Sequence, residues 1–474
     1  MKPLRAFIVL LLATSACATG GGPRVPGATT PSPVALPAPA ALAQPARVLL
    51  VSIHGLSPAR YLTADGARAM PMLAALAQQG VAAESMRPVF PPASYPAHAT
   101  LVTGVSVAKH GIAAAGLDRA SDLRAASLWQ AVAEQGRTVA SLDWPTTGGA
   151  AIADLAPDLV VPAGANWLDA LASGGAGRAA EFARRAGGGD PSAAAPGAAR
   201  DATLVTMACA LLLAEPAPGL VLLRLSQTQV ALDGAGPDSE PARIAFAASD
   251  AELGRLVRCL GDAGLLDTTG IAVAGDHGAM PVHTEIRANA ALAEAGLLVP
   301  SGSGVRSFDA ITRSNGGSAF VYASSDDPAL LARRALDAAA NETGAFRVMS
   351  ARDMVERGAD PEAWFGLEAE PGYVFADAAK GPLLAPASVA SAGGYATSDP
   401  HMATGFVAWG PGLRRGLRVP GLRQTDVAPT LARWIGVSFG PVEGRTLVGW
   451  FATTTVPAIR VEQAEPAPRV PGRK

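Results

Sequence analysis

The stretch from Val89 to Gly104 reads VFPPASYPAHATLVTG, and the rest of the chain is organised around it. Two prolines stiffen the approach to Ser94, and residues 95–103 then have the pattern of a helix with Pro96 in its first turn, where a missing N–H costs nothing. We therefore expect Ser94 at the N-cap of this helix. A hydroxyl there faces the positive end of the helix dipole and free backbone N–H groups, which suits a nucleophile that attacks an oxyanion-bearing phosphorus. The alternative is that Ser94 only caps the helix.

The composition is that of a globular protein with linkers. The chain has 474 residues, of which 49% are hydrophobic and 16% charged, and its formal net charge is −2. This length accommodates one large α/β domain with insertions, or two domains. A near-neutral charge gives no electrostatic reason to expect nucleic acid as a partner.

The N-terminus has the features of an export signal. Lys2 and Arg5 precede the apolar run 6–13, which is too short to span a membrane. Small residues then lead to Cys17, as in a bacterial lipoprotein cleavage box. We predict that residues 1–17 are a lipoprotein signal peptide and that Cys17 is the lipidation site, so that the membrane anchor is lipid alone.

Two residues beside Cys17 qualify this prediction. Thr14 replaces the usual Leu of the cleavage box, so an ordinary signal peptide with a chance cysteine is the alternative. Ala18 does not resemble the Asp that retains lipoproteins in the inner membrane, which favours an envelope lipoprotein of the outer membrane, facing the periplasm. Residues 18–46, rich in Pro, Gly and Ala, are predicted to be a flexible tether.

Buried strands and helices alternate along residues 47–450. Apolar runs predict strands at residues 47–53, 137–142, 219–225, 270–274 and 404–409. Periodic segments predict helices at residues 71–79, 202–213, 246–260, 328–340 and 427–435. This alternation indicates an α/β domain with a doubly wound, mostly parallel sheet and helices on both faces.

Three further segments depart from that pattern. Residues 172–200 are mostly Gly, Ala and Arg, and we predict a mobile insertion. Short strand signals and a helix at about residues 305–390 predict a small α/β insertion that resembles a cap. Residues 451–474 are rich in proline and charge, and we predict a disordered tail.

Polar residues follow three of the predicted strands. His54 follows the first, a loop at residues 227–236 follows the third, and Asp276-His277 follows the fourth. Open α/β sheets bind ligands at the carboxyl ends of their strands, so we expect these residues to share one site.

Cys209 and Cys259 lie on two predicted helices that flank one strand. An exported protein could join them in a disulfide. Two unpaired buried thiols are the favoured interpretation, because two helices rarely present matched Cβ vectors.

Together these motifs resemble the nucleotide pyrophosphatase/phosphodiesterase branch of the alkaline phosphatase superfamily. The likeness runs from about Arg47 to Trp450 and includes, besides the Ser94 segment, the motifs at residues 86–91, 426–431 and 443–447. It implies an alkaline-phosphatase-like core, two zinc ions and a nucleophilic Thr or Ser that attacks a phosphodiester.

One of the two implied metal sites is chemically complete. The resemblance assigns it to His54, Ser94, Asp276 and His277, with His54 in place of the family's Asp. Two imidazoles and a carboxylate form a credible catalytic zinc set, with Ser94 or water in the fourth position. Exchanging Asp for His removes one negative charge, so the metal would be a stronger Lewis acid held with less charge attraction.

The second implied metal site has lost most of its ligands. The family's Asp, His and His fall on Gln229, Asp233 and Gly393. One carboxylate does not hold zinc in water, so we predict that only the first zinc binds. His401 could fold back into this site, with an exposed loop histidine as the alternative.

Other positions of the family pattern concern the substrate. Ala97 replaces an Asn that helps to hold the phosphate, while Trp144 and Tyr395 are candidate walls for a base or aryl group, with core packing as the alternative. His98 is expected to be structural, because on a helix it would point away from a capping Ser94.

Three functions follow from these residues. The first is a cell-envelope, metal-dependent phosphoesterase or phosphodiesterase with Ser94 as nucleophile at a one-zinc site, acting on a small phosphorylated substrate. The second is a non-catalytic family member that binds a phosphorylated or cell-wall ligand. The third is a hydrolase of another ester, such as a sulfate or phosphonate.

Overall fold

The structure, a computed structural model, describes residues 44–114, 119–156, 177–185, 196–302, 304–452 and 461–463. The predicted signal peptide with Cys17, and the predicted tether up to residue 43, lie outside the described residues. Among the described helices, none combines the length and the apolar character needed to cross a membrane.

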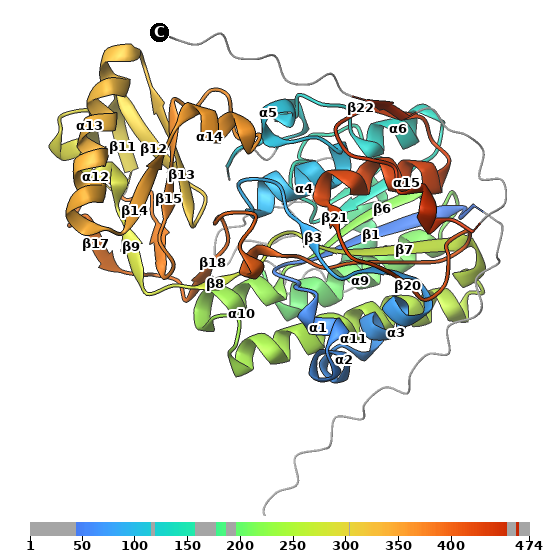
Figure 1. Cartoon of the computed structure of the whole chain (residues 1–474). Coiled ribbons are helices and arrows are strands. Elements are labelled where there is room, and N and C mark those ends of the chain that lie inside the picture. Colours follow the sequence, from blue (N-terminus) through green and yellow to red (C-terminus); the bar gives the residue numbers. More distant parts are fainter. Residues whose placement is uncertain are drawn as a thin grey trace, which may run out of the picture. The chain divides into compact units, whose positions relative to one another are not determined.

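An eight-stranded sheet forms the centre of the fold (Figure 1). In spatial order its strands are β20 (Leu417–Val419), β2 (Val81–Ala83), β19 (Phe406–Trp409), β7 (Thr269–Gly275), β1 (Arg47–Ile53), β6 (Leu220–Leu225), β4 (Val139–Leu142) and β5 (Asp154–Ala156). Only β19 runs antiparallel to its neighbours β2 and β7. The predicted α/β class and mostly parallel sheet are confirmed, and β1 has the predicted bounds.

Both faces of this sheet are buried under helices. Along β1, Val48 and Leu50 pack into one hydrophobic cluster, and Leu49 and Val51 into the other. The first cluster includes α4 (Ser94–Thr103), α6 (Leu128–Glu134) and α15 (Val427–Ile435), and the second includes α3 (Pro71–Gln79), α9 (Ala198–Leu213) and α11 (Glu240–Asp262). Burial on both faces explains why β1 is a continuous apolar run instead of an alternating one.

A second group of sheets follows β7 in the chain and is coloured yellow to orange in Figure 1. Its antiparallel sheet has the order β12 (Ala310–Ser314), β13 (Ser318–Ala323), β15 (Phe365–Ala369) and β14 (Phe346–Met349). A three-stranded sheet contains β16 (Tyr373–Phe375), β9 (Thr284–Ile286) and β17 (Leu384–Pro386). Helices α12 (Ala288–Glu294) and α13 (Asp326–Thr343) share its hydrophobic cluster. This group therefore includes β9 and α12, which precede the insertion predicted at about residues 305–390.

Three segments predicted to lack regular structure contain some. Residues 227–236, predicted as a loop, form helix α10 (Gln227–Ala235), because the buried Asp201 carboxylate accepts the N–H groups of Ser226 and Gln227 and so caps the helix from outside. Within 172–200, residues 177–185 form helix α8, and its Arg178 donates to the buried Asp154 at 2.7 Å. In the predicted disordered tail, β23 (Val461–Gln463) pairs with β22 (Phe439–Val442).

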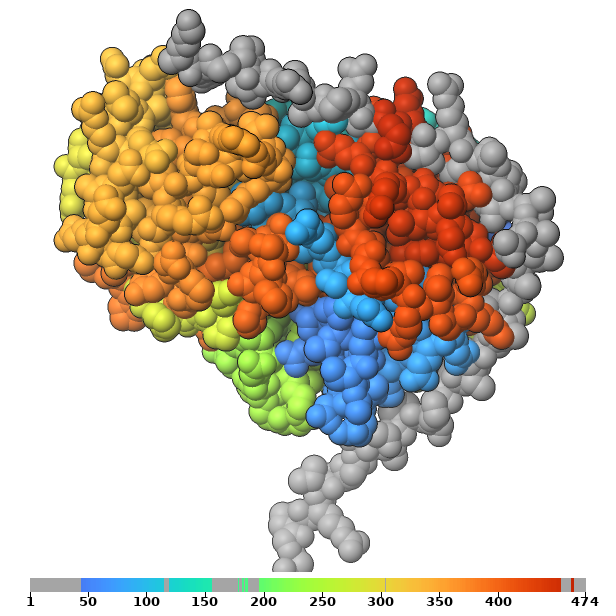
Figure 2. Space-filling view, viewed as in Figure 1, coloured from blue at the N-terminus to red at the C-terminus, as the bar shows by residue number. Residues whose placement is uncertain are grey.

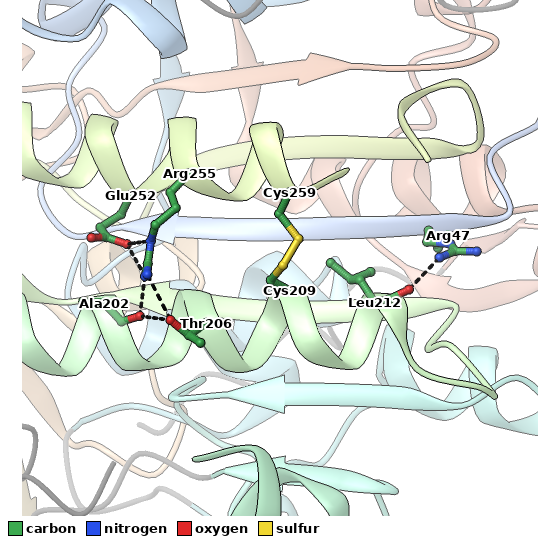
Figure 3. Close-up of a disulfide and its surroundings, with 8 residues drawn as sticks. All are labelled: Arg47, Ala202, Thr206, Cys209, Leu212, Glu252, Arg255 and Cys259. Carbon is green, nitrogen blue, oxygen red and sulfur yellow. Dashed lines mark hydrogen bonds and ion pairs between the residues drawn. A yellow bond between two sulfur atoms is a disulfide. The ribbon is translucent and has the colours of Figure 1, made fainter. Parts of the chain in front are cut away.

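Cys209 and Cys259 form a disulfide between α9 and α11 (Figure 3), so the prediction of two unpaired thiols is wrong. The two helices lie side by side on one face of the sheet, and the Cα atoms of the two cysteines are 6.3 Å apart. Arg255 of α11 also donates to Thr206 of α9 at 2.9 Å. The rotation of each helix about its axis decides this pairing, and that rotation follows from packing, which the spacing of the cysteines does not encode.

Removal of the disulfide is expected to destabilise the protein. The cysteines are 50 residues apart, and closing a loop of that length restricts the unfolded chain by about 4 kcal/mol at 25 °C. The double variant Cys209→Ala/Cys259→Ala should therefore lose about 2–4 kcal/mol in free energy of unfolding, measured by urea titration without reductant. Wild-type protein in reductant should approach the variant, and equal stability of the oxidised wild type and the variant would contradict the prediction.

His110 is a fully buried histidine at the end of α5 (Val107–His110). Its Nδ1 accepts the N–H of Ile112 at 3.0 Å, and its Nε2 lies 3.0 Å from the Thr100 hydroxyl. Burial lowers the pKa of His110 to about 3. The folded protein therefore holds this imidazole in its neutral form.

Acid is expected to destabilise the fold through His110. Between pH 6.5 and about pH 3 the unfolded chain binds a proton here and the folded chain does not, so stability that is present above pH 6.5 is lost as the pH falls. One such proton contributes a slope of about 1.4 kcal/mol per pH unit. Urea titrations at pH 5, 6 and 7 give the free energy of unfolding at each pH. This free energy should fall less steeply with decreasing pH in His110→Gln than in the wild type, and an equal pH dependence would refute this role.

Candidate active site

His54 lies at the carboxyl end of β1, directly after the last strand residue. It is 5% exposed, and its carbonyl accepts the hydroxyl of Thr228 at 2.8 Å. Gly55 follows with φ +69°, a left-handed conformation that a side chain would strain, and a Cβ there would meet Leu232 at 2.3 Å. The chain therefore turns sharply after β1 and leaves the imidazole at the edge of the sheet.

Asp276 and His277 lie at the carboxyl end of β7, next to His54. The register pairs Ile53 with Gly275, so the residues that follow the two strands are neighbours. The Asp276 carboxylate accepts the N–H of Gly55 at 2.9 Å and that of His277 at 2.8 Å through Oδ1. Its Oδ2 lies 2.8 Å from His54 Nδ1. The sheet and these hydrogen bonds together fix the three side chains.

These three side chains have the donor set that zinc requires. One ligand atom of each of His54, Asp276 and His277 lies within 4.8 Å of the others, and all three residues are buried. Nδ1 of His277 contacts the carbonyl of Gly278 at 2.7 Å, which leaves Nε2, 3.7 Å from Asp276 Oδ2, as the ligating nitrogen. Two imidazoles and a carboxylate are the chemistry of a catalytic zinc site, and the residues therefore fit one metal.

The protonation states also suit a cation. Burial alone would raise the pKa of Asp276, but His277 and His54 outweigh it and hold that pKa well below its usual value. Burial lowers the pKa of His277, and the charge of Asp276 opposes only part of that shift. An ionised carboxylate beside a neutral imidazole is the state in which both ligate a metal.

Ser94 is the first residue of α4 and not its N-cap, because the helix begins one residue earlier than predicted. Ala93 is the N-cap, with an extended φ of −131°, and its carbonyl accepts the N–H of Ala97 at 3.0 Å. The single-residue error arises because both residues precede Pro96, and the sequence does not show which carbonyl begins the helical ladder. Ser94 is partly exposed and remains in the first helical turn, near the positive end of the helix dipole.

His98 contacts Ser94, so the expectation that it points away is wrong. Its Nδ1 lies 2.7 Å from the Ser94 carbonyl and 3.3 Å from the Ser94 hydroxyl, because residues four apart share one helix face. A carbonyl only accepts, so we assign the proton to Nδ1, and Nε2 then accepts the Ser52 hydroxyl at 2.9 Å. Burial lowers the pKa of His98 to about 4. With no free acceptor nitrogen, His98 orients Ser94 and does not serve as its base.

Two observations place the segment of Ser94 near the three candidate ligands. The charges of Asp276 and His54 act on His98, which contacts Ser94. A Cβ placed on Gly393 would lie 2.5 Å from His277 Nδ1 and 2.6 Å from the carbonyl of Pro92, so the segment that leads to Ser94 comes close to His277. In Figure 2 a light-blue surface, the colour of the chain around residue 100, lies between the orange and the red parts of the chain.

The residues of the second implied zinc site do not fit a metal. Gln229 and Asp233 lie one turn apart on α10, and Gln229 hydrogen-bonds the Asp233 carboxylate. Gly393 has no room for any side chain between His277 and Pro92. Among the described residues, His54, Asp276 and His277 are the one group of three potential ligands. The His401 side chain is 59% exposed and pairs with Asp399 at 2.9 Å, and it does not belong to the group of potential ligands.

Three predicted substrate-contacting positions are buried. Ala97 is fully buried within α4, and fully buried Trp144 packs edge-to-face on His98 with ring centroids 4.8 Å apart. Tyr395 is 3% exposed, covers Gly317, and donates its hydroxyl to the Tyr373 carbonyl. Core packing, the alternative for both aromatic residues, therefore accounts for their contacts.

Comparisons with known proteins agree with this architecture. Human ectonucleotide pyrophosphatase/phosphodiesterase 5 superposes with a TM-score of 0.60 at 17% identity, covering 84% of this chain and 97% of its own. The murine protein gives a TM-score of 0.61 at 18% identity with the same coverage, also as an inactive variant in complex with AMP. At these identities the likeness shows the fold. No curated protein sequence matches the chain.

The family follows from the sequence match. The model of type I phosphodiesterase / nucleotide pyrophosphatase matches residues 48–380, which include six of the eight strands of the central sheet and most of the second group of sheets. The resemblance seen in the motifs is thereby confirmed. The chain belongs to the type I phosphodiesterase/nucleotide pyrophosphatase family.

Proposed function

We propose that the protein is a metal-dependent phosphoesterase with Ser94 as its nucleophile and one zinc ion held by His54, Asp276 and His277. The observation that carries the proposal is the convergence of these three buried side chains, within 4.8 Å, at the sheet edge to which the segment before Ser94 comes close. A phosphorylated nucleotide is the proposed ligand, because the murine structural neighbour was solved with AMP.

The chain's own residues account for much of the chemistry. The Ser94 hydroxyl loses its proton to solvent as Oγ bonds to phosphorus, while the bond to the leaving oxygen breaks and that oxygen takes up a proton. Water then cleaves the phosphoserine, which restores the Ser94 hydroxyl and releases the phosphorylated product. The first turn of α4 directs its dipole at the oxyanions, and His98 holds the nucleophile's backbone and hydroxyl in place. Zinc, when bound, supplies Lewis-acid polarisation and lowers the pKa of a coordinated hydroxyl.

A non-catalytic binding protein is the second candidate function, because the residues at the second zinc site do not fit a metal. Two-metal sites stabilise both the attacking and the leaving oxygen, and losing one such contact commonly costs about 10²–10³ in rate. Turnover of an aryl phosphodiester by the zinc-loaded protein, abolished by a chelator and restored by zinc, supports the phosphoesterase. Zinc binding without turnover supports the binding protein.

We expect a metal content of about one zinc per chain, because a complete ligand set exists once among the described residues. Elemental analysis of protein purified with excess zinc and then desalted measures this ratio directly. The His54→Ala variant should contain much less zinc, whereas His401→Ala, which removes an exposed histidine, should match the wild type. A ratio of about two would show that the second site binds metal despite Gly393.

We also infer an exported, lipid-anchored protein of the outer membrane that faces the periplasm, with Cys17 as the lipidation site. The disulfide between Cys209 and Cys259 supports export, because such bonds persist in oxidising compartments. Globomycin-sensitive processing and loss of membrane association in Cys17→Ala would support the anchor. A Cys17→Ala protein that remains with the outer membrane would refute it.

A further inference from the structure

Gln424 joins two parts of the candidate site that are far apart in the sequence. It begins the short 3₁₀ helix η5 (Gln424–Asp426) and is 1% exposed. Its Oε1 accepts the backbone N–H of Val89 at 2.9 Å, and its Nε2 donates to the backbone carbonyl of Asp276 at 2.8 Å. One buried amide thus connects the segment that leads to Ser94 with the turn that carries Asp276.

The two partners fix the orientation of this amide. The N–H of Val89 can only donate and the carbonyl of Asp276 can only accept, so exchanging the oxygen and nitrogen of Gln424 would break both bonds. Glutamate at this position would present an acceptor to the Asp276 carbonyl, and leucine would leave both backbone groups without this partner. The contact therefore requires a neutral amide with the length of glutamine.

Gln424 also links two segments that the central sheet does not join. Asp276 follows β7 and is held by the sheet, whereas Val89 follows the short strand β3 (Met86–Arg87), which pairs outside the central sheet with β21 (Leu422–Arg423). The short segment between Val89 and Ser94 contains the two prolines Pro91 and Pro92. Because the prolines restrict the backbone of this segment, a displacement of Val89 would also displace Ser94.

We propose that Gln424 is a positioning residue that holds Ser94 in register with the Asp276–His277 turn. The proposal rests on the proposed function, in which Ser94 is the nucleophile and the turn holds zinc. Gln424 touches neither the reacting atoms nor the ligand atoms, and its effect passes through the two backbones that it joins.

Asn289 offers a matched control. It is also a buried amide, 1% exposed, and it bridges backbones: its Oδ1 accepts the N–H of Thr312 at 2.8 Å, and its Nδ2 donates to the carbonyls of Thr312 and Asp377. All of these partners belong to the second group of sheets. Asn289→Leu therefore removes comparable hydrogen bonds without touching the segment of Ser94 or the turn of Asp276.

The test compares Gln424→Leu, Gln424→Glu and Asn289→Leu with the wild type, each as the full zinc-loaded chain. kcat and KM for an aryl phosphodiester, zinc content and melting temperature are measured. A misplaced nucleophile should lower kcat by about 10–100-fold in both Gln424 variants, with KM within about threefold and zinc retained. Asn289→Leu should lose melting temperature and keep kcat within about twofold.

Equal kcat in the Gln424 and Asn289 variants at equal loss of melting temperature would overturn the proposal and leave Gln424 with a structural role. If Gln424→Leu does not fold, the comparison is made with Gln424→Glu, which preserves side-chain size. The proposed function fails in a different way, through wild-type turnover that neither a chelator nor Ser94→Ala reduces.

Discussion

Ser94→Ala is expected to lower kcat by at least about 10³-fold while zinc content and melting temperature stay near wild-type values. Removing the nucleophile of a covalent mechanism commonly costs about 10⁴–10⁶ in kcat, and the metal and the helix dipole would retain part of the remaining rate. Alanine is a good helix former at the first position of α4, and no side-chain capping bond is lost with the hydroxyl. Steady-state kinetics with an aryl phosphodiester, on protein of known zinc content, measures the effect.

Two variants control this experiment. Ser94→Thr keeps a hydroxyl on the same carbon and should keep measurable activity, since the resemblance allows either residue as nucleophile. Ser106 is the N-cap of α5 and makes no side-chain capping bond, so Ser106→Ala removes a comparable serine from a helix start and should leave kcat within about twofold. Undiminished turnover in Ser94→Ala would remove Ser94 from the mechanism and leave water as the nucleophile.

Asp276→Asn is expected to weaken zinc binding by at least about 100-fold. The carboxylate accepts the N–H groups of Gly55 and His277 and contacts His54 Nδ1, so it both supplies charge and orients a neighbouring ligand. Changing groups that merely orient a ligand costs about 10–100-fold in metal affinity, and the lost negative charge adds to that. The amide oxygen of asparagine can still accept both backbone N–H groups, which the carboxylate binds through a single oxygen, so the loss should fall mainly on zinc binding.

Asp233→Asn is the matched control for Asp276. Both are carboxylates near His54 and His277, but Asp233 lies on α10, where it hydrogen-bonds Gln229. Competition with a chromophoric chelator should give Asp233→Asn a zinc affinity within about threefold of the wild type. An equal loss in both variants would mean that Asp233 ligates the metal, and the assignment of His54, Asp276 and His277 as the complete set would be wrong.

The elements that could be predicted from the sequence are those with a strong local signal. The bounds of β1, α3 and α15 match the expectation, because a continuous apolar run and periodic helical segments that end at a glycine are encoded locally. The proximity of His54 and Asp276 was also predicted from the sequence, since parallel neighbouring strands bring their carboxyl ends together.

Three of the misses share a physical cause, which is capping or pairing by residues remote in sequence. α10 has a weak helical pattern, and its capping carboxylate comes from Asp201, before β6. The disulfide depends on the rotation of α9 against α11. Gln424 has no motif of its own and became visible only through its partners Val89 and Asp276, although its place beside the predicted helix at 427–435 offered a weak signal.

The pairing of β1 with β7 positions the site, whereas the side chains that follow the two strands determine its chemistry. Ile53 and Gly275 are register partners, so the spacing of positions 54 and 276 is set first by the backbone hydrogen bonds of the strands that precede them. Evolution can therefore exchange the ligand type at position 54 by point mutation without rebuilding the protein. His54→Asp is the corresponding engineering step, and it offers a route to retune the metal preference of this centre on an unchanged frame.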